Sequence, residues 1–137
     1  MNLIEVYFGF HRPYSSSFRG WFGHVEAWGY TEDDNWLFID PWLSETRLYV
    51  CHRHDDVVEM MAVRYATCES ILKIRPNGQK LRFPLHFPMN CATICGHLVG
   101  MRAFTPSGLR RKLLANGAEV IHGCPEGRSR GQEGQTA

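Results

Sequence analysis

The sequence predicts an α+β fold, in which a mainly antiparallel sheet packs against a helix that carries a cysteine. Two observations lead to this fold class. Most β-type runs come early and follow one another through short turns, whereas the helical patterns all lie after residue 54. The 137 residues also suit one domain with its own core. We therefore assign residues 1–123 to a single domain and expect residues 124–137, rich in Gly, Glu, Arg and Gln, to be a disordered tail.

Four β-type runs are expected in the first 51 residues. Residues 2–10 alternate in polarity as a strand does, and residues 11–17 are expected to form a loop because they hold a proline and three serines. Residues 24–30 and 35–41 are aromatic and β-branched on either side of a short acidic turn, so they predict a β-hairpin. Residues 46–51 are expected to add a further strand.

One helix is expected over residues 55–67, because Asp55 and Asp56 can cap its start. The stripe expected to face the core consists of Val57, Met60, Met61, Val63 and Arg64. Residues 70–74 then predict a strand, which the Pro-Asn-Gly sequence at 76–78 ends.

Two helical patterns follow. The first begins at Cys91, after an extended approach that contains two prolines. Thr105 as N-cap and Pro106 as the first helical residue favour a second helix through 107–115. The Asn-Gly pair after it is a typical C-cap, and residues 118–122 are expected to form a short closing strand.

Cys91 occupies a position that favours a reactive thiol. Pro88 prevents the helix that begins at Cys91 from extending further toward the N-terminus. The side chain of Asn90 can cap the first turn of this helix. Cys91 is then the first helical residue, where the helix dipole favours the thiolate. Helix N-termini are among the settings that lower a cysteine pKa from about 8.5 toward about 3.5–7.5. Cys91 is therefore the candidate nucleophile, and the competing interpretation is a small buried residue.

A nucleophile of this kind needs a base, and His24 at the start of the first hairpin strand is the candidate. Asp40 ends the second hairpin strand, so the two are expected to be cross-strand neighbours, with the carboxylate holding one imidazole nitrogen. Glu26, on the same strand face as His24, and Asn35 are alternative partners. Together Cys91, His24 and Asp40 make a nucleophile, a base and an orienting acid.

This arrangement resembles the papain-like thiol hydrolases of the NlpC/P60 superfamily. The order of His24, Asp40 and Cys91 is similar to that of the circularly permuted branch, which includes the lecithin:retinol acyltransferase-like enzymes. Asn90-Cys91 is similar to the Asn-Cys motif of that branch, and the strand that begins at His24 is similar to its histidine strand. The resemblance covers roughly residues 20–100. It implies a permuted papain-like fold, and the chain also resembles small papain-like proteins encoded by tailed bacteriophages.

The other cysteines, histidines and tryptophans have simpler interpretations. Cys95 is expected to pack in the core, and His97 to be exposed or hydrogen-bonded. Residues 51–56 hold metal-ligand types, but no second cluster completes a tetrahedral site, so we interpret them as a polar turn and expect no metal and no cofactor. Four tryptophans lie in or near the predicted hairpin, and we expect their side chains to form part of the core or the wall of a groove: Trp21, Trp28, Trp36 and Trp42.

Composition argues against several classes. A net charge of +1 gives no electrostatic reason to expect nucleic-acid binding. No apolar run reaches the length of about 18 residues that a membrane-spanning helix needs, and no basic region precedes an apolar stretch at the start of the chain. Five cysteines without a CxxC pair favour reduced thiols, so we expect a cytoplasmic protein, or a virion protein if a phage encodes it.

Two function classes follow from the sequence. The first is a cysteine-dependent hydrolase or acyltransferase, which would act on an amide or ester in a peptide, cell-wall or acyl substrate through Cys91, His24 and Asp40. The second is a papain-like fold kept as a non-catalytic structural or binding module with protein partners, such as a component of a phage particle. The reactivity of Cys91 separates the two.

Overall fold

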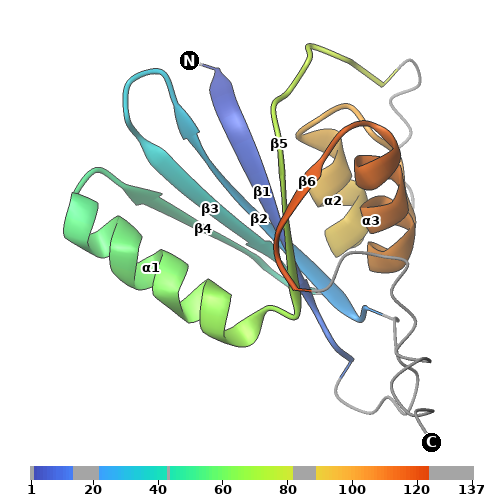
Figure 1. Ribbon diagram of the computed structural model, residues 1–137, viewed down its shortest axis with the longest axis horizontal. Helices are drawn as coiled ribbons and strands as arrows, with labels where there is room; N and C mark the ends of the chain where they lie inside the picture. Colours follow the sequence, from blue (N-terminus) through green and yellow to red (C-terminus); the bar gives the residue numbers. More distant parts are fainter. Residues whose placement is uncertain (1, 14–21, 43, 82–88, 124–137) are drawn as a thin grey trace, which may run out of the picture.

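A computed structural model describes residues 2–13, 22–42, 44–81 and 89–123 (Figure 1). The elements among these residues are, in chain order, β1 (Leu3–His11), β2 (His24–Thr31), β3 (Trp36–Pro41), β4 (Thr46–Cys51), α1 (His54–Thr67), β5 (Ser70–Ile74), α2 (Cys91–His97), α3 (Pro106–Ala115) and β6 (Glu119–His122). Each expected strand and helix is confirmed, with ends that differ by a residue or two. The expected tail at 124–137 lies outside the described residues, as does most of the expected loop at 11–17.

The strands form one antiparallel sheet in the order β4-β3-β2-β1-β5-β6. This confirms the α+β class and the antiparallel sheet. β2 and β3 are the expected hairpin, with Ala27 opposite Ile39 and Tyr30 opposite Trp36. β1 lies between β2 and β5, so the first strand of the chain is central and touches segments far from it in sequence.

Helices cover both faces of the sheet, with α1 on one side and α2 and α3 on the other (Figure 1). Successive side chains of a strand point to opposite faces, so β1 and β2 contribute to both cores. The core under α2 and α3 includes Val6, Phe8, Phe10, Val25, Ala27, Leu72, Ala92, Cys95, Leu109 and Leu113. The core under α1 includes Tyr7, Trp28, Trp36, Phe38, Val57, Met60, Met61, Cys68 and Ile71.

Helix α1 packs through the expected stripe except at Val63, which is 55% exposed. Arg64 is buried, and its guanidinium carbon lies 4.6 Å from the centroid of the Phe38 ring. Its Nε atom lies 2.6 Å from Glu26 Oε1, an ion pair across the interface between helix and sheet. A charged residue therefore faces the core because the sheet supplies an opposite charge and an aromatic surface.

β1 ends one residue later than expected, and the extra residue bears on the site. His11, expected to begin a loop, is the last residue of β1 and pairs with His24 of β2. The centroids of the two imidazole rings are 5.6 Å apart. The sheet therefore brings a second histidine beside the candidate base.

The N-terminus of α2 has the expected cap. Asn90 Oδ1 accepts a hydrogen bond from the Thr93 N–H at 2.9 Å, and Thr93 Oγ1 accepts one from the Asn90 N–H at 2.8 Å. One turn on, the buried Cys95 donates from Sγ to the carbonyl oxygen of Val25 at 3.7 Å. The cap starts the helix at Cys91, and the Cys95 contact ties that helix to the beginning of β2.

Candidate active site

The candidate site forms where β2 begins and β3 ends. Ala27 lies opposite Ile39 in the hairpin, and continuing this register by one residue sets Glu26 opposite Asp40. Residues two apart on a strand share a face, so His24 and Glu26 project from the same side of β2 as Asp40 does from β3. The hairpin alone therefore brings the imidazole and two carboxylates together.

The structure pairs His24 with Asp40. The Nε2 atom of His24 lies 2.7 Å from Asp40 Oδ1, and both side chains are largely buried. The other carboxylate oxygen, Oδ2, accepts a hydrogen bond from Trp42 Nε1 at 2.9 Å. The indole of Trp42 stacks on the imidazole, with ring centroids 4.5 Å apart and planes 20° apart. Trp42 thus holds both the ring and the acid, and Asp40 fixes which nitrogen of His24 faces away from it.

Cys91 meets His24 from the other side. The thiol is half-buried at the first position of α2, and its hydrogen-bond partners are the imidazole of His24 and the backbone amides of Val25 and Ala92. Burial alone would raise the pKa of Cys91, but these hydrogen bonds and the nearby imidazole outweigh it and lower that pKa. Cys91 therefore has a greater tendency to be a thiolate than an ordinary cysteine.

The pKa values of His24 and Asp40 are also shifted toward the charged forms of both side chains. Burial opposes the charged form of His24, yet its hydrogen bonds to Asp40 and Cys91 raise its pKa to about 9. Burial opposes the charge of Asp40 as well, but the bonds from His24 and Trp42 lower the pKa of the carboxyl group. Near neutral pH Asp40 is therefore a carboxylate and His24 an imidazolium, and the charge of the imidazolium favours the thiolate form of Cys91.

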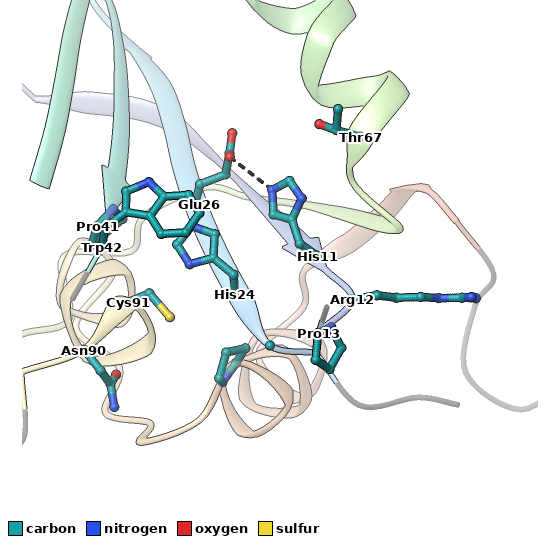
Figure 2. A pocket seen from close by; sticks show the side chains of 12 residues that line it. His11, Arg12, Pro13, His24, Glu26, Pro41, Trp42, Thr67, Asn90 and Cys91 are labelled. Carbon is teal, nitrogen blue, oxygen red and sulfur yellow. Dashed lines mark hydrogen bonds and ion pairs between the residues drawn. The ribbon is translucent and has the colours of Figure 1, made fainter. Parts of the chain in front are cut away.

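A cavity of about 790 Å³ opens over these groups (Figure 2). Its walls come from the ends of β1, β3 and α1, from β2, and from the starts of α2 and α3: His11, Arg12, Pro13, Gly23, His24, Glu26, Pro41, Trp42, Thr67, Asn90, Cys91 and Pro106. Figure 2 shows the sulfur of Cys91 beside the ring of His24. The volume is within the range of about 300–1,000 Å³ of small-molecule sites.

The two alternative partners of His24 have other contacts. Glu26 Oε2 lies 3.1 Å from His11 Nε2, and its other oxygen pairs with Arg64. Asn35 Oδ1 pairs with His52 Nδ1 on the exposed part of the hairpin. Asp40 is therefore the group that the structure places against the imidazole.

Other sequence candidates fall outside the site. Cys95 is fully buried in the core, and its pKa lies well above the usual value because burial opposes the thiolate. His97 is exposed on α2. Within the described parts of the chain, the residues at 51–56 are not among the groups of three ligand-type side chains that converge.

Three residues of this region carried little signal in the sequence. The sequence indicates Trp42 only as core or groove wall, yet its side chain contacts both His24 and Asp40. No sequence pattern marks His11 or Cys68 as a site residue, although they converge on Glu26 beside the cavity. Strand alternation extended by one residue would have placed His11 on the sheet, but its neighbours depend on strand order.

Comparison with known proteins adds no relative to this description. No protein-family model, curated protein or solved structure matches the chain. In the described ranges, no helix combines the length and apolar character needed to cross a membrane. The assignment of a role to this site therefore depends on its geometry and chemistry.

Proposed function

We propose that the protein is a cysteine-dependent hydrolase or acyltransferase that acts on an amide or ester through an acyl-enzyme. The observation that carries the proposal is the contact chain from Cys91 to His24 to Asp40 at one cavity. A nucleophile, a base within hydrogen-bond reach and a group that orients the base are the parts that acyl transfer to a thiol requires. Their order along the chain supports a permuted papain-like architecture.

In the first half-reaction the Cys91 thiolate attacks the substrate carbonyl carbon, and the carbonyl electrons move to its oxygen. The oxyanion is close to the Cys91 backbone amide at the N-terminus of α2, because the Ala92 and Thr93 amides already contact the thiol and Asn90. The tetrahedral intermediate collapses to a thioester as the leaving amine or alcohol takes a proton from His24. Asp40 holds Nε2, so Nδ1 is the nitrogen that transfers this proton.

In the second half-reaction a water molecule attacks the thioester and gives its proton to His24. The C–S bond breaks, the acid leaves, and the thiolate and imidazolium are restored. An acceptor alcohol or amine in place of water makes the same step an acyl transfer. Asp40 stabilises the imidazolium in both halves and need not change its protonation state.

The cavity supports substrates with an apolar part next to the scissile bond. Trp42, Pro13 and Pro106 contribute apolar surface, and Arg12 is a cation at the rim, although it pairs with Glu69. A peptide, a cell-wall crosslink and a lipid acyl group each combine such a part with an amide or ester. The substrate class proposed here is accordingly an acyl group with an apolar portion.

Acylation by p-nitrophenyl acetate tests this proposal. The full chain should release p-nitrophenolate in a burst and retain one acetyl group, which peptide mass mapping should locate on Cys91. Cys91→Ser should abolish the burst, and His24→Ala should slow it by about 10²–10⁴-fold, the usual contribution of a general base. Cys51→Ser is the matched control, because Cys51 is a half-buried thiol away from this cavity.

Acetylation that is no faster at Cys91 than at Cys51, or that His24→Ala leaves unchanged, would contradict a catalytic role. That result would favour the alternative, a fold of this kind kept as a binding or structural module. A specific observation in favour of the module would be a partner protein that protects Cys91 from alkylation.

A further inference from the structure

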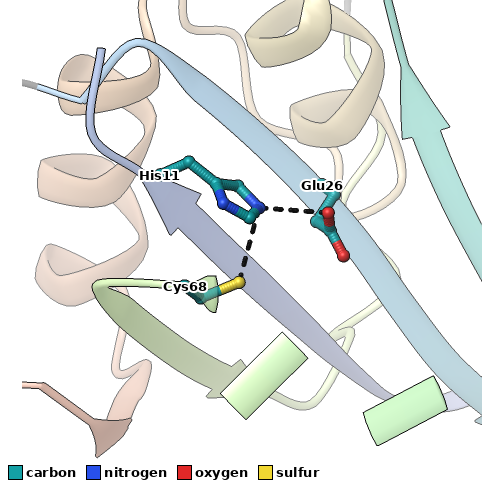
Figure 3. A group of neighbouring side chains, drawn as sticks. All are labelled: His11, Glu26 and Cys68. Atoms are coloured by element: carbon teal, nitrogen blue, oxygen red, sulfur yellow. Dashed lines mark hydrogen bonds and ion pairs between the residues drawn. The ribbon is translucent and has the colours of Figure 1, made fainter. Parts of the chain in front are cut away.

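A second group of side chains converges beside the candidate triad (Figure 3). It consists of His11 at the end of β1, Glu26 on β2 and Cys68 between α1 and β5. One ligand atom of each lies within 4.8 Å of those of the others. An imidazole, a carboxylate and a thiol are three of the side-chain types that bind zinc.

The spacing of these atoms suits a shared metal ion. His11 Nε2 lies 3.5 Å from Cys68 Sγ and 3.1 Å from Glu26 Oε2. Zinc–ligand bonds of about 2.0–2.1 Å to nitrogen and oxygen and about 2.3 Å to sulfur, at tetrahedral angles, separate nitrogen from sulfur by about 3.5 Å and nitrogen from oxygen by about 3.3 Å. The two separations from His11 are therefore close to those of a tetrahedral zinc site, and the atoms of Cys68 and Glu26 lie within 4.8 Å of each other.

The surroundings hold these donors in place. Arg64 Nε lies 2.6 Å from Glu26 Oε1, while Oε2 is the oxygen that faces His11. A ligating carboxylate commonly has such a partner on its second oxygen, which fixes its orientation. Gly9 allows Cys68 to reach the sheet, because a Cβ atom at Gly9 would lie 2.6 Å from the Cys68 sulfur.

The site is buried but has a way in. Cys68 is 4% exposed and Glu26 is 7% exposed. His11 and Glu26 also line the cavity of about 790 Å³, so an ion can enter from there. The cavity side also leaves room for water or a small ligand as the fourth donor, the arrangement found in zinc sites that stay open to ligands.

We propose that His11, Glu26 and Cys68 bind a single divalent transition-metal ion, with Zn²⁺ as the best match, and that the fourth position faces the cavity. On binding, the Cys68 thiol loses its proton to solvent, and His11 coordinates as a neutral imidazole through Nε2. This departs from the sequence-based expectation of no metal. It is independent of the proposed acyl-transfer activity.

One other group could compete for the ion. His24, Glu26 and Asp40 also place a ligand atom each within 4.8 Å of one another. That set shares Glu26 but has no sulfur, and thiolate ligands favour zinc over the hard cations that carboxylates prefer. A probe that reports a metal–thiolate bond therefore distinguishes the two sets.

Cobalt(II) titration of the reduced, metal-free full chain provides such a probe. One equivalent should produce a thiolate-to-cobalt charge-transfer band and the visible bands of tetrahedral cobalt, and Zn²⁺ should displace both. Cys68→Ser should abolish the charge-transfer band. Cys91→Ser and Cys51→Ser should keep it, since neither thiol belongs to the proposed site.

His11→Asn and Glu26→Gln test the other two ligands in zinc competition assays, with circular dichroism to confirm folding. Each should weaken zinc binding by at least about 10–100-fold, the effect of losing an outer-shell partner. A charge-transfer band that survives Cys68→Ser, or that Cys91→Ser removes, would overturn the proposal. So would zinc binding with no saturation at one equivalent in the full chain.

Discussion

At the scale of the residue, His24 connects the parts of the candidate site. Its Nε2 atom is held by Asp40, its ring is covered by Trp42, and its other side meets Cys91. Burial opposes the charge of His24, but the contacts with Asp40 and Cys91 raise its pKa to about 9. The same contacts make the protonation of Cys91 depend on His24.

The first prediction concerns this dependence. His24→Ala should raise the pKa of Cys91, because burial then acts without the imidazole that lowers it. The rate of iodoacetamide alkylation at Cys91, mapped by mass spectrometry from pH 5 to pH 10, measures the change. His54→Ala, at an exposed position on α1, is the control and should leave the profile unchanged. Identical profiles for His24→Ala and the parent would show that the two residues are not coupled.

The second prediction concerns Asp40. Asp40→Asn preserves the shape of the side chain and removes its charge, so the pKa of His24 should fall from about 9 toward its ordinary value near 6.5. NMR titration of the imidazole protons measures the shift, and the six other histidines serve as internal controls. A response at another histidine with His24 unmoved would place the acid elsewhere.

At the scale of the element, the first turn of α2 positions the thiol. The reciprocal hydrogen bonds of Asn90 and Thr93 start the helix at Cys91, and Asn90 Nδ2 also donates to the carbonyl oxygen of Phe104 at 2.9 Å. The cap thus joins α2 to the segment before α3. Loss of the cap should affect the fold and the thiol together.

The third prediction follows from the cap. Asn90→Ala should lower the free energy of unfolding by about 0.5–2 kcal/mol, measured by urea denaturation. Asn2→Ala, at an exposed position before β1, should change it little. Because Asn90 and Thr93 act as one unit, the double variant Asn90→Ala/Thr93→Ala should lose less than the sum of the single losses. Additive losses would show that the two side chains act separately.

At the scale of the whole molecule, the antiparallel sheet joins two sets of polar groups at one cavity. The hairpin contributes His24 and Asp40, and the central position of β1 adds His11 beside them. Cys68, directly after α1, completes the second set with His11 and Glu26. It lies on the sheet face opposite to α2. The stability of the molecule therefore depends on the protonation of these groups.

The fourth prediction is a pH dependence of stability. A raised His24 pKa stabilises the fold fully below about pH 6.5, and this contribution is lost as pH rises through about 9. A lowered Cys91 pKa acts in the opposite sense: its contribution is present above about pH 8.5 and is lost as pH falls through the native value. Between these limits folding favours proton uptake at His24 and proton release at Cys91, so the two slopes oppose each other.

Cys91→Ser should leave the pH dependence of the free energy of unfolding that comes from His24, without the opposing contribution of the thiol. The free energy of unfolding of this variant should fall as pH rises above about 6.5, by at most about 1.4 kcal/mol per pH unit, while the parent changes less. Chemical denaturation at a series of pH values measures both. Parallel curves for the two proteins would mean that folding does not change the protonation of Cys91.

Much of the candidate site could be predicted because its signals are local. The cap before Cys91 spans four residues, and the hairpin that joins His24 to Asp40 is closed by one short turn. Strand alternation and capping depend on neighbours within a few residues, so the sequence determined these elements and the faces on which their side chains lie. The antiparallel α+β class followed from the order of those elements.

Only the tertiary structure decided the distant partners of His11, Cys68 and Arg64. The pairing of His11 with His24, and its approach to Cys68, depends on the placement of β1 between β2 and β5. The inward position of Arg64 depends on Glu26 from another strand, and without that charge its burial would be unfavourable. Strand order and long-range charge pairing are set by the packing of the whole chain, because no local pattern specifies which segments become neighbours.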